Sequence, residues 1–293
     1  MTRTDAVLLA VAVAAVSTSA PLVREAAAPA LAVAFWRNGL ASTGLVPAAV
    51  VSGRRRDVPV RTWLVAAAAG LVLGAHFAAW ISSLSSTTVA ASVALVATQP
   101  VWTALIGRMT GERLTARAWA GIGLALVGVV IVTGVDVHAS THALRGDVLA
   151  LIGGMFAAGY VSLGSVARRR LTTTDYTAAC YSVAAVALLV AALAAGQPLV
   201  GFGLRTWLCI AAITAGPQLL GHSVFNRLLR SVGPTVVSVA ILGEIVGSAL
   251  LAAWWFGERP SAGLAPAAAC IIAGVVLVVR GGAMRPADEI VAG

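Results

Sequence analysis

The sequence contains no lysine, and only 11% of its 293 residues carry a charged side chain. A soluble domain is about one quarter charged. Hydrophobic residues instead make up 59% of the chain, and the mean hydropathy is +0.94. This balance excludes an ordinary soluble globular fold and predicts that lipid surrounds much of the chain.

Several chemical signatures are also missing. Without lysine there is no phosphate-binding GxxxxGK[ST] loop, so ATP hydrolysis at such a loop is excluded. No HExxH or GxSxG motif occurs, and the three cysteines show neither metal-ligand spacing nor a disulfide framework. We expect the protein to be no enzyme and to need no cofactor.

One short stretch, "DVHASTH" at 136–142, places two histidines four residues apart beside an acid. This spacing on a helix can bind a metal ion. The stretch lies in an expected loop and offers no third firm ligand. We therefore interpret it as solvated loop and expect no metal.

Long apolar runs dominate the remaining sequence. About 20 apolar residues are needed to cross the hydrocarbon core as a helix, and barrel strands would be shorter and alternating. The sequence predicts ten transmembrane helices, at about 6–23, 29–51, 63–83, 87–107, 117–135, 147–166, 177–196, 204–224, 234–256 and 261–280. The first run resembles a cleaved signal, but Pro21 follows the small-residue site and disfavours cleavage.

The arginines indicate the orientation of these helices. The net charge of +9 would be compatible with nucleic-acid binding, but no DNA- or RNA-binding motif accompanies it. If both termini are cytoplasmic, fifteen arginines fall in cytoplasmic segments and four in outer loops. Such a bias is typical of a multi-pass protein of the bacterial cytoplasmic membrane. An even number of helices agrees with it.

An internal repeat divides the chain. At an offset of 146 residues, the stretch from Gly74 matches the stretch from Leu220 over about forty residues. The match places His76 on His222 and Trp80 on Asn226. Each repeat holds five expected helices, so the second copy enters the membrane inverted. We predict two inverted five-helix repeats, 1–140 and 141–293, around a central cavity, as in many secondary transporters.

Two stretches carry a family resemblance: "LVATQPVWTALIGRMTGERLTARAWAGIGLALVGVVIVTG" and "ILGEIVGSALLAAWWFGERPSAGLAPAAACIIAGVVLVVRG". They resemble the ends of the two repeat units of the EamA family in the drug/metabolite transporter superfamily. The resemblance covers essentially the whole chain and implies transport of a small molecule. Members of that family usually carry a proline after the acid of the ninth helix. Ile245 stands there in this sequence, so a break in this helix is less firmly indicated.

Two charged residues fall inside expected helices. Glu244 should lie near the middle of the bilayer, where a charge costs several kcal/mol unless it faces water or a partner. It could bind a cationic group, carry a proton, or be a protonated structural carboxyl. Arg37 lies about 12 Å into its helix. It could contact an anionic group, pair with Glu244, or extend to the outer interface.

Uncharged polar and aromatic residues complete the candidate site. The pairs His76 with Trp80 and His222 with Asn226 each share one helix face, and either line the cavity or form hydrogen bonds between helices. Further candidates for binding are Gln99 and Tyr160, and for helix breaks or gating Pro100 and Pro217.

Together these features predict a secondary active transporter that exports small metabolites or drug-like compounds by alternating access. The expected partners are a small-molecule substrate and the lipid bilayer, with protons as an open possibility and nucleic acid excluded. A membrane-embedded enzyme and a non-transporting membrane sensor are the alternatives. The sequence does not determine the substrate, the direction of transport or the oligomeric state.

Overall fold

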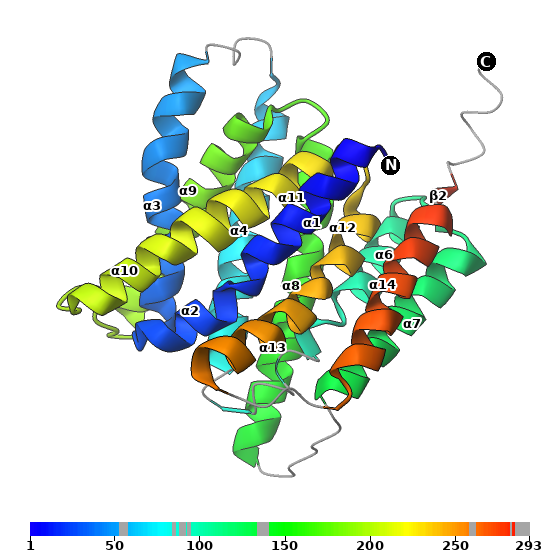
Figure 1. The fold of residues 1–293 in the computed structure, drawn as a ribbon. Coiled ribbons are helices and arrows are strands. Elements are labelled where there is room, and N and C mark those ends of the chain that lie inside the picture. Colours follow the sequence, from blue (N-terminus) through cyan, green and yellow to red (C-terminus); the bar gives the residue numbers. More distant parts are fainter. Residues whose placement is uncertain are drawn as a thin grey trace.

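The computed structural model describes residues 1–52, 58–83, 86–87, 92, 95–133, 141–257, 262–281 and 283–284, and is almost entirely helical (Figure 1). Its helices are α1 (Arg3–Ser17), α2 (Ser19–Ala26), α3 (Ala30–Val51), α4 (Val60–Ser83), α6 (Gln99–Met109), α7 (Ala116–Thr133), α8 (Thr141–Ala167), α9 (Thr173–Ala194), α10 (Leu204–Ile213), the π-helix η1 (Thr214–His222), α11 (Ser223–Leu228), α12 (Pro234–Ile241), α13 (Gly243–Phe256) and α14 (Leu264–Gly281). Two short strands, β1 (Arg113–Leu114) and β2 (Ala283–Met284), pair antiparallel.

Seven helical stretches in the described residues are long and apolar enough to cross a membrane. They are Arg3–Ala26, Val60–Ser83, Leu144–Ala167, Thr173–Ala194, Leu204–Leu228, Pro234–Phe256 and Leu264–Gly281. A shorter apolar helix covers Ala116–Ile131. The expectation of an all-helical membrane protein is confirmed to this extent.

The predicted number of ten spans is not reached in the described residues, for two reasons. Helix α3 has 22 residues, but Arg37 and Asn38 lower its mean hydropathy, and it is not among the seven. The expected span 87–107 is represented by the 11-residue helix α6, and residues 88–91 and 93–94 lie outside the described residues. The ten-helix arrangement therefore stays a prediction.

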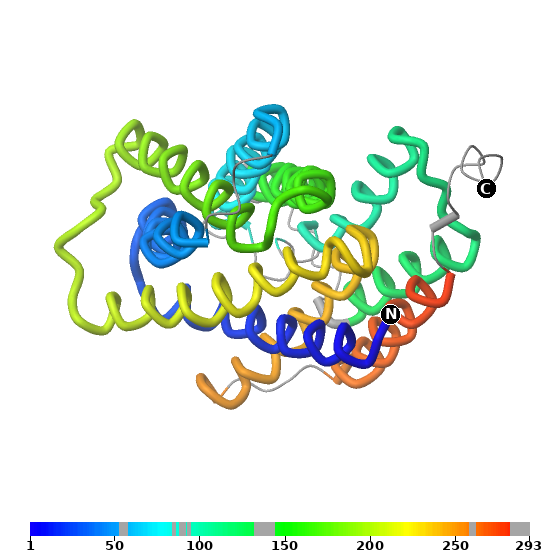
Figure 2. The backbone as a smooth tube through the Cα atoms, turned by 90° about the horizontal axis from the view of Figure 1, so that it is seen from above, coloured from blue at the N-terminus to red at the C-terminus, as the bar shows by residue number. Residues whose placement is uncertain are grey.

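The helices form one bundle in which segments far apart in sequence lie side by side. Helix α4 packs against α8 and α9, α3 packs against α9, and α1 runs along η1 (Figures 1 and 2). At the other side of the bundle α7 packs against α14. The larger apolar core lies among α1, α3, α4, α8, α9 and α11, and a smaller one lies among α6, α7, α12 and α14.

Small residues allow α7 and α14 to approach closely. A methyl group added to Gly121 would lie 2.7 Å from the carbonyl oxygen of Gly274, and one added to Gly128 would lie 2.7 Å from that of Ala267. These distances are too short for a carbon–oxygen contact. Only glycine therefore fits at these two positions, as is common where membrane helices pack tightly.

Candidate functional site

Helix interruptions lie where the sequence places its candidate residues. The α-helical hydrogen bonding stops at Leu242, between α12 and α13, where the backbone bonds Leu242 N–H to Val239 O and Ile245 N–H to Leu242 O span only three residues. The interruption is thus present even though Ile245 replaces the expected proline. Glu244 consequently lies in the first turn of α13, where the helix dipole favours a negative charge.

The two candidate prolines differ in their surroundings. Pro100 does not bend a continuous helix: α6 begins at Gln99, so the proline occupies the first turn, where its missing N–H costs nothing. Pro217 lies inside η1, whose π-helical turns are wider than α-helical ones. Wide turns of this kind occur often at functional sites.

A buried arginine occupies the centre of the polar network. The Arg37 side chain is fully buried, and its Nε donates to Gln218 Oε1 at 2.8 Å. Nη1 makes a longer contact of 3.5 Å to Ser19 Oγ, and the guanidinium lies 4.3 Å above the Phe77 ring. The remaining nitrogen, Nη2, is buried and has no hydrogen-bond partner among the described residues. Protein therefore encloses this arginine on all sides.

Gln218 joins this arginine to the neighbouring helices. Its Nε2 donates to Asn38 Oδ1 at 3.0 Å, so η1 is bonded to two consecutive residues of α3. Its backbone oxygen, within the π-helix, accepts from Ser223 Oγ at 3.3 Å and is 3.5 Å from the Tyr181 hydroxyl. Gln218 therefore links α3, η1 and α9.

Asn226 forms hydrogen bonds with two buried tyrosines. Tyr160 OH donates to Asn226 Oδ1 at 2.7 Å, and Asn226 Nδ2 donates to Tyr181 OH at 3.2 Å. The Tyr181 hydroxyl also lies 3.2 Å from Ser223 Oγ. Three of the predicted site residues, Arg37, Tyr160 and Asn226, are thus connected through Gln218 and Tyr181. We call these five residues the central polar network.

The two histidines flank this network through aromatic contacts. His76 stacks on Trp80 with ring centroids 5.9 Å apart and an interplanar angle of 6°. Its Nδ1 lies 2.9 Å from the carbonyl oxygen of Gly153, which can only accept, so Nδ1 carries the hydrogen. His222 meets Phe77 edge-on at 5.7 Å and Tyr160 at 6.4 Å. Both histidines therefore lie within one aromatic cluster beside the network.

Glu244 and Gln99 do not bond to the central polar network in the part of the chain that the structure describes. Glu244 is half-buried, and no ion pair joins it to Arg37. Gln99 is buried, and its backbone oxygen accepts from Thr103 Oγ1 at 3.0 Å. Pairing of Arg37 with Glu244, one of the three alternatives considered for this arginine, is not seen, and Arg37 bonds to neutral partners instead.

The structure adds residues that the sequence prediction missed. Gln218, Asn38, Ser19 and Phe77 all contact Arg37 or its partner. The two amides carry a signal that could have identified them, because a polar side chain within an apolar span is costly and needs a partner. Nothing in the apolar pattern distinguishes Phe77 from other core residues.

The stretch 136–142 cannot be placed, because residues 136–140 and the side chains of residues 141 and 142 lie outside the described part of the chain. Among the described side chains, no three histidine, cysteine, aspartate or glutamate residues gather where they could hold a metal ion.

A bundle of apolar helices with interrupted segments and a buried polar network is typical of a membrane transporter. The sequence profile of the EamA-like transporter family matches residues 4–134 and 144–280. The chain belongs to this family.

Comparisons with individual proteins agree. The chain is 27% identical over 241 residues to the inner membrane transporter YedA of Escherichia coli (strain K12), covering 80% of this chain and 76% of that protein. It is 28% identical over 250 residues to a transporter of Archaeoglobus fulgidus, covering 83% and 80%. A solved crystal structure superposes with a TM-score of 0.76 at 21% identity, covering 94% of this chain and 96% of the other. That structure supports the fold.

Proposed function

We propose that this protein is a secondary active transporter that exports small metabolites or drug-like compounds across the cytoplasmic membrane by alternating access. Family membership supports the transport of a small molecule. The relation to an inner membrane transporter supports the location. The observation that carries the proposal is the buried Arg37, whose Nη2 has no hydrogen-bond partner in the described part of this apolar bundle.

Burial of this arginine lowers the stability of the fold, so its presence indicates a functional role. A buried cation in a membrane bundle loses its hydration, and neutral partners such as Gln218 offset only part of that loss. The free Nη2 can donate to an anionic group of a substrate. Phe77, Tyr160 and His222 supply aromatic surfaces beside it. Glu244, half-buried in the first turn of α13, would take a cationic group or a proton.

The proposed mechanism needs two inverted halves, 1–140 and 141–293, with both termini cytoplasmic. Packing supports this arrangement. At an offset of 146 residues, Gly121 and Gly128 correspond to Ala267 and Gly274. The close approach of Gly121 to Gly274 is therefore matched by that of Gly128 to Ala267. The pairing of α1 with η1 likewise corresponds to that of α8 with α4. Halves related in this way can exchange conformations and open a site to alternate sides.

Transport can be tested with purified protein in liposomes, using a panel of amino acids, amines, organic acids, nucleosides and drugs. A melting-temperature screen of the same panel would select the compounds, because a ligand that binds the folded state stabilises it. We expect flux of at least one compound under its own gradient or a proton gradient, and loss of that flux in R37Q. Folded protein that moves no member of the panel under either gradient would contradict the proposal.

A further inference from the structure

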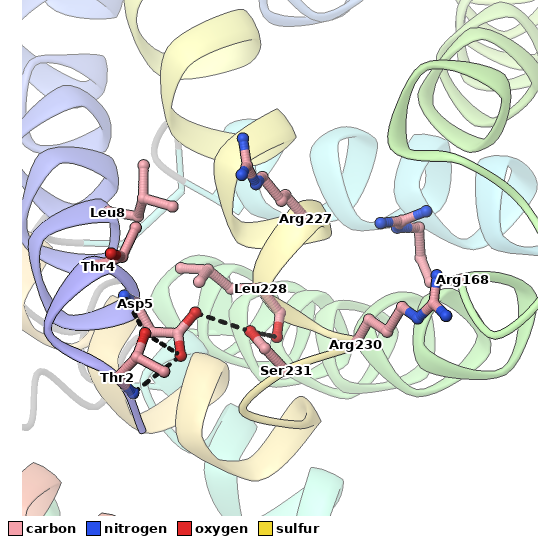
Figure 3. Close-up of a pocket in the computed structure, with 9 residues that line it drawn as sticks. All are labelled: Thr2, Thr4, Asp5, Leu8, Arg168, Arg227, Leu228, Arg230 and Ser231. Carbon is pink, nitrogen blue, oxygen red and sulfur yellow. Dashed lines mark hydrogen bonds between the residues drawn. The ribbon is translucent and has the colours of Figure 1, made fainter.

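A second polar site adjoins the central polar network, at the end of the bundle that contains the N-terminus, and its Arg168 donates to the backbone of Asn226. A pocket of about 520 Å³ is bounded by the start of α1, the end of α8 and the segment joining α11 to α12 (Figure 3). Its lining includes three arginines, Arg168, Arg227 and Arg230, together with Asp5 and Ser231. The function proposed above makes no use of this pocket.

The single carboxylate in the lining is already occupied. Asp5 Oδ2 accepts from Thr2 N–H at 3.0 Å and from the Thr2 hydroxyl at 2.9 Å, and Asp5 Oδ1 accepts from the Ser231 hydroxyl at 3.1 Å. The bond from Thr2 N–H to Asp5 and the reciprocal bond from Asp5 N–H to Thr2 Oγ1, at 3.1 Å, form a capping box at the N-terminus of α1. The aspartate is therefore committed to neutral donors.

The three arginines consequently lie together with no acidic partner in the described part of the chain. Among the described residues, no carboxylate comes within ion-pair distance of Arg168, Arg227 or Arg230. Arg168 is nearly buried and donates to two backbone carbonyls, Asn226 O at 3.0 Å and Leu171 O. Arg227 and Arg230 are exposed. Burial lowers the pKa of Arg168, and the charges of Arg230 and Arg227 lower it further.

The depth of the pocket indicates which anion can reach it. Arg168 directly follows the span Leu144–Ala167, Arg230 lies two residues beyond the span Leu204–Leu228, and Asp5 lies near the start of the span Arg3–Ala26. Three span ends therefore meet at the pocket, and a bilayer crossed by these spans would have its boundary with water at this level. Phospholipid headgroups lie at this depth, and basic pockets between helices bind their phosphates.

We propose that this pocket is a binding site for a phosphate group, held by Arg227 and Arg230 with Arg168 as the fixed, buried part of the site. Guanidinium groups match the oxygen geometry of phosphate. An anion bound here would reduce the repulsion among the three arginines. It would take the place that an acidic side chain would otherwise fill. The phosphate can belong to a lipid headgroup or be free in the cytoplasm, and both sources use the same contacts.

The test compares two double variants with equal charge loss. R227Q/R230Q removes the two exposed arginines of the pocket. R108Q/R117Q removes two exposed arginines outside it, at the same predicted membrane face, and serves as the control. Binding of phosphatidylglycerol and phosphatidylcholine to the purified, delipidated protein is titrated by native mass spectrometry. Thermal stability in inorganic phosphate is measured against chloride at equal ionic strength.

We expect wild type to bind phosphatidylglycerol more tightly than phosphatidylcholine, or to be stabilised by inorganic phosphate. A surface arginine contributes about fivefold to the binding of an anionic lipid, so R227Q/R230Q should weaken the preferred ligand roughly 20-fold. R108Q/R117Q should change it less than about threefold. A response to phosphatidylglycerol alone identifies the lipid as the source, and a response to inorganic phosphate alone identifies the free ion.

Equal binding by the two double variants would overturn the proposal, as would a wild type that responds to neither probe. Melting temperatures without ligand separate lost binding from lost folding. If R227Q/R230Q melts below the control, R227K/R230K provides the second measurement. This variant keeps the charge and should retain at least part of the phosphate response if the site exists.

Discussion

The contact between α7 and α14 gives a prediction whose size follows from the structure. We expect Gly121→Ala to destabilise the protein, because its methyl group would lie 2.7 Å from the Gly274 carbonyl oxygen and 2.9 Å from Leu277 Cβ. The first neighbour is backbone and cannot rotate away. The two helices would have to separate by several tenths of an ångström, which weakens their whole interface.

Gly123 on the same helix provides the matched control. It is exposed, and a methyl group there would have no atom within 4 Å. Both substitutions gain the same helix propensity, about 1 kcal/mol for glycine to alanine, so this gain cancels in their difference. What remains is the overpacking term, about 1–3 kcal/mol. Gly121→Ala should therefore melt roughly 2–12 °C below Gly123→Ala.

Thermal melting of both variants in one detergent, followed by tryptophan fluorescence, measures this difference. Gly128→Ala adds a second comparison. Its methyl group would lie 2.7 Å from the Ala267 carbonyl oxygen, and the proposed symmetry predicts a similar loss. If Gly121→Ala melts at or above Gly123→Ala, the close packing of α7 on α14 is refuted. Unequal losses at the two glycines would contradict the symmetry between the halves.

Three further predictions concern transport. Glu244→Gln should fold with an unchanged melting temperature but lose proton-coupled or cation exchange in liposomes; normal flux at every pH would show that this carboxyl is structural. Arg37→Lys keeps the charge but loses the Nε contact to Gln218. It should reduce flux at least about tenfold, since one charge-assisted bond contributes about 1.5–3 kcal/mol. Flux equal to wild type would show that the Arg37 guanidinium does not take part in transport. In a cysteine-free background, Ser52→Cys should react with an impermeant thiol reagent only from the cytoplasm and Val200→Cys only from outside; labelling from one common side would contradict the inverted topology.

Much of the helical architecture could be predicted from the sequence, because apolar length alone determines whether a helix can cross a bilayer. The expected spans 204–224 and 234–256 lie within observed spans. Their internal structure could not be predicted from hydropathy. Pro217, a predicted helix break, lies inside the π-helix from Thr214 to His222, whereas the interruption at Leu242 has no proline to signal it.

Individual site residues could be predicted from the sequence more easily than the residues that they bond to. Arg37 is conspicuous as a cation within an apolar run. Because a charge in contact with lipid is costly, such a residue is expected to face the interior of the bundle, and Arg37 is buried there. Its bonding to Gln218 rather than to an acid was not predictable. That choice depends on the relative rotation of α3 and η1, which no local pattern encodes. The positions of Glu244 and Gln99 relative to the network depend on helix interruptions in the same way.

Asn226 connects the arginine pocket to the central polar network. Its backbone oxygen is bonded by Arg168 at the arginine pocket, while its side chain is bonded by Tyr160 and Tyr181 in the interior. Any displacement of α11 must stretch or break both sets of bonds together. A headgroup or ion bound at the proposed phosphate site would therefore contact, through Arg168, the same residue that joins α8 and α9 in the interior.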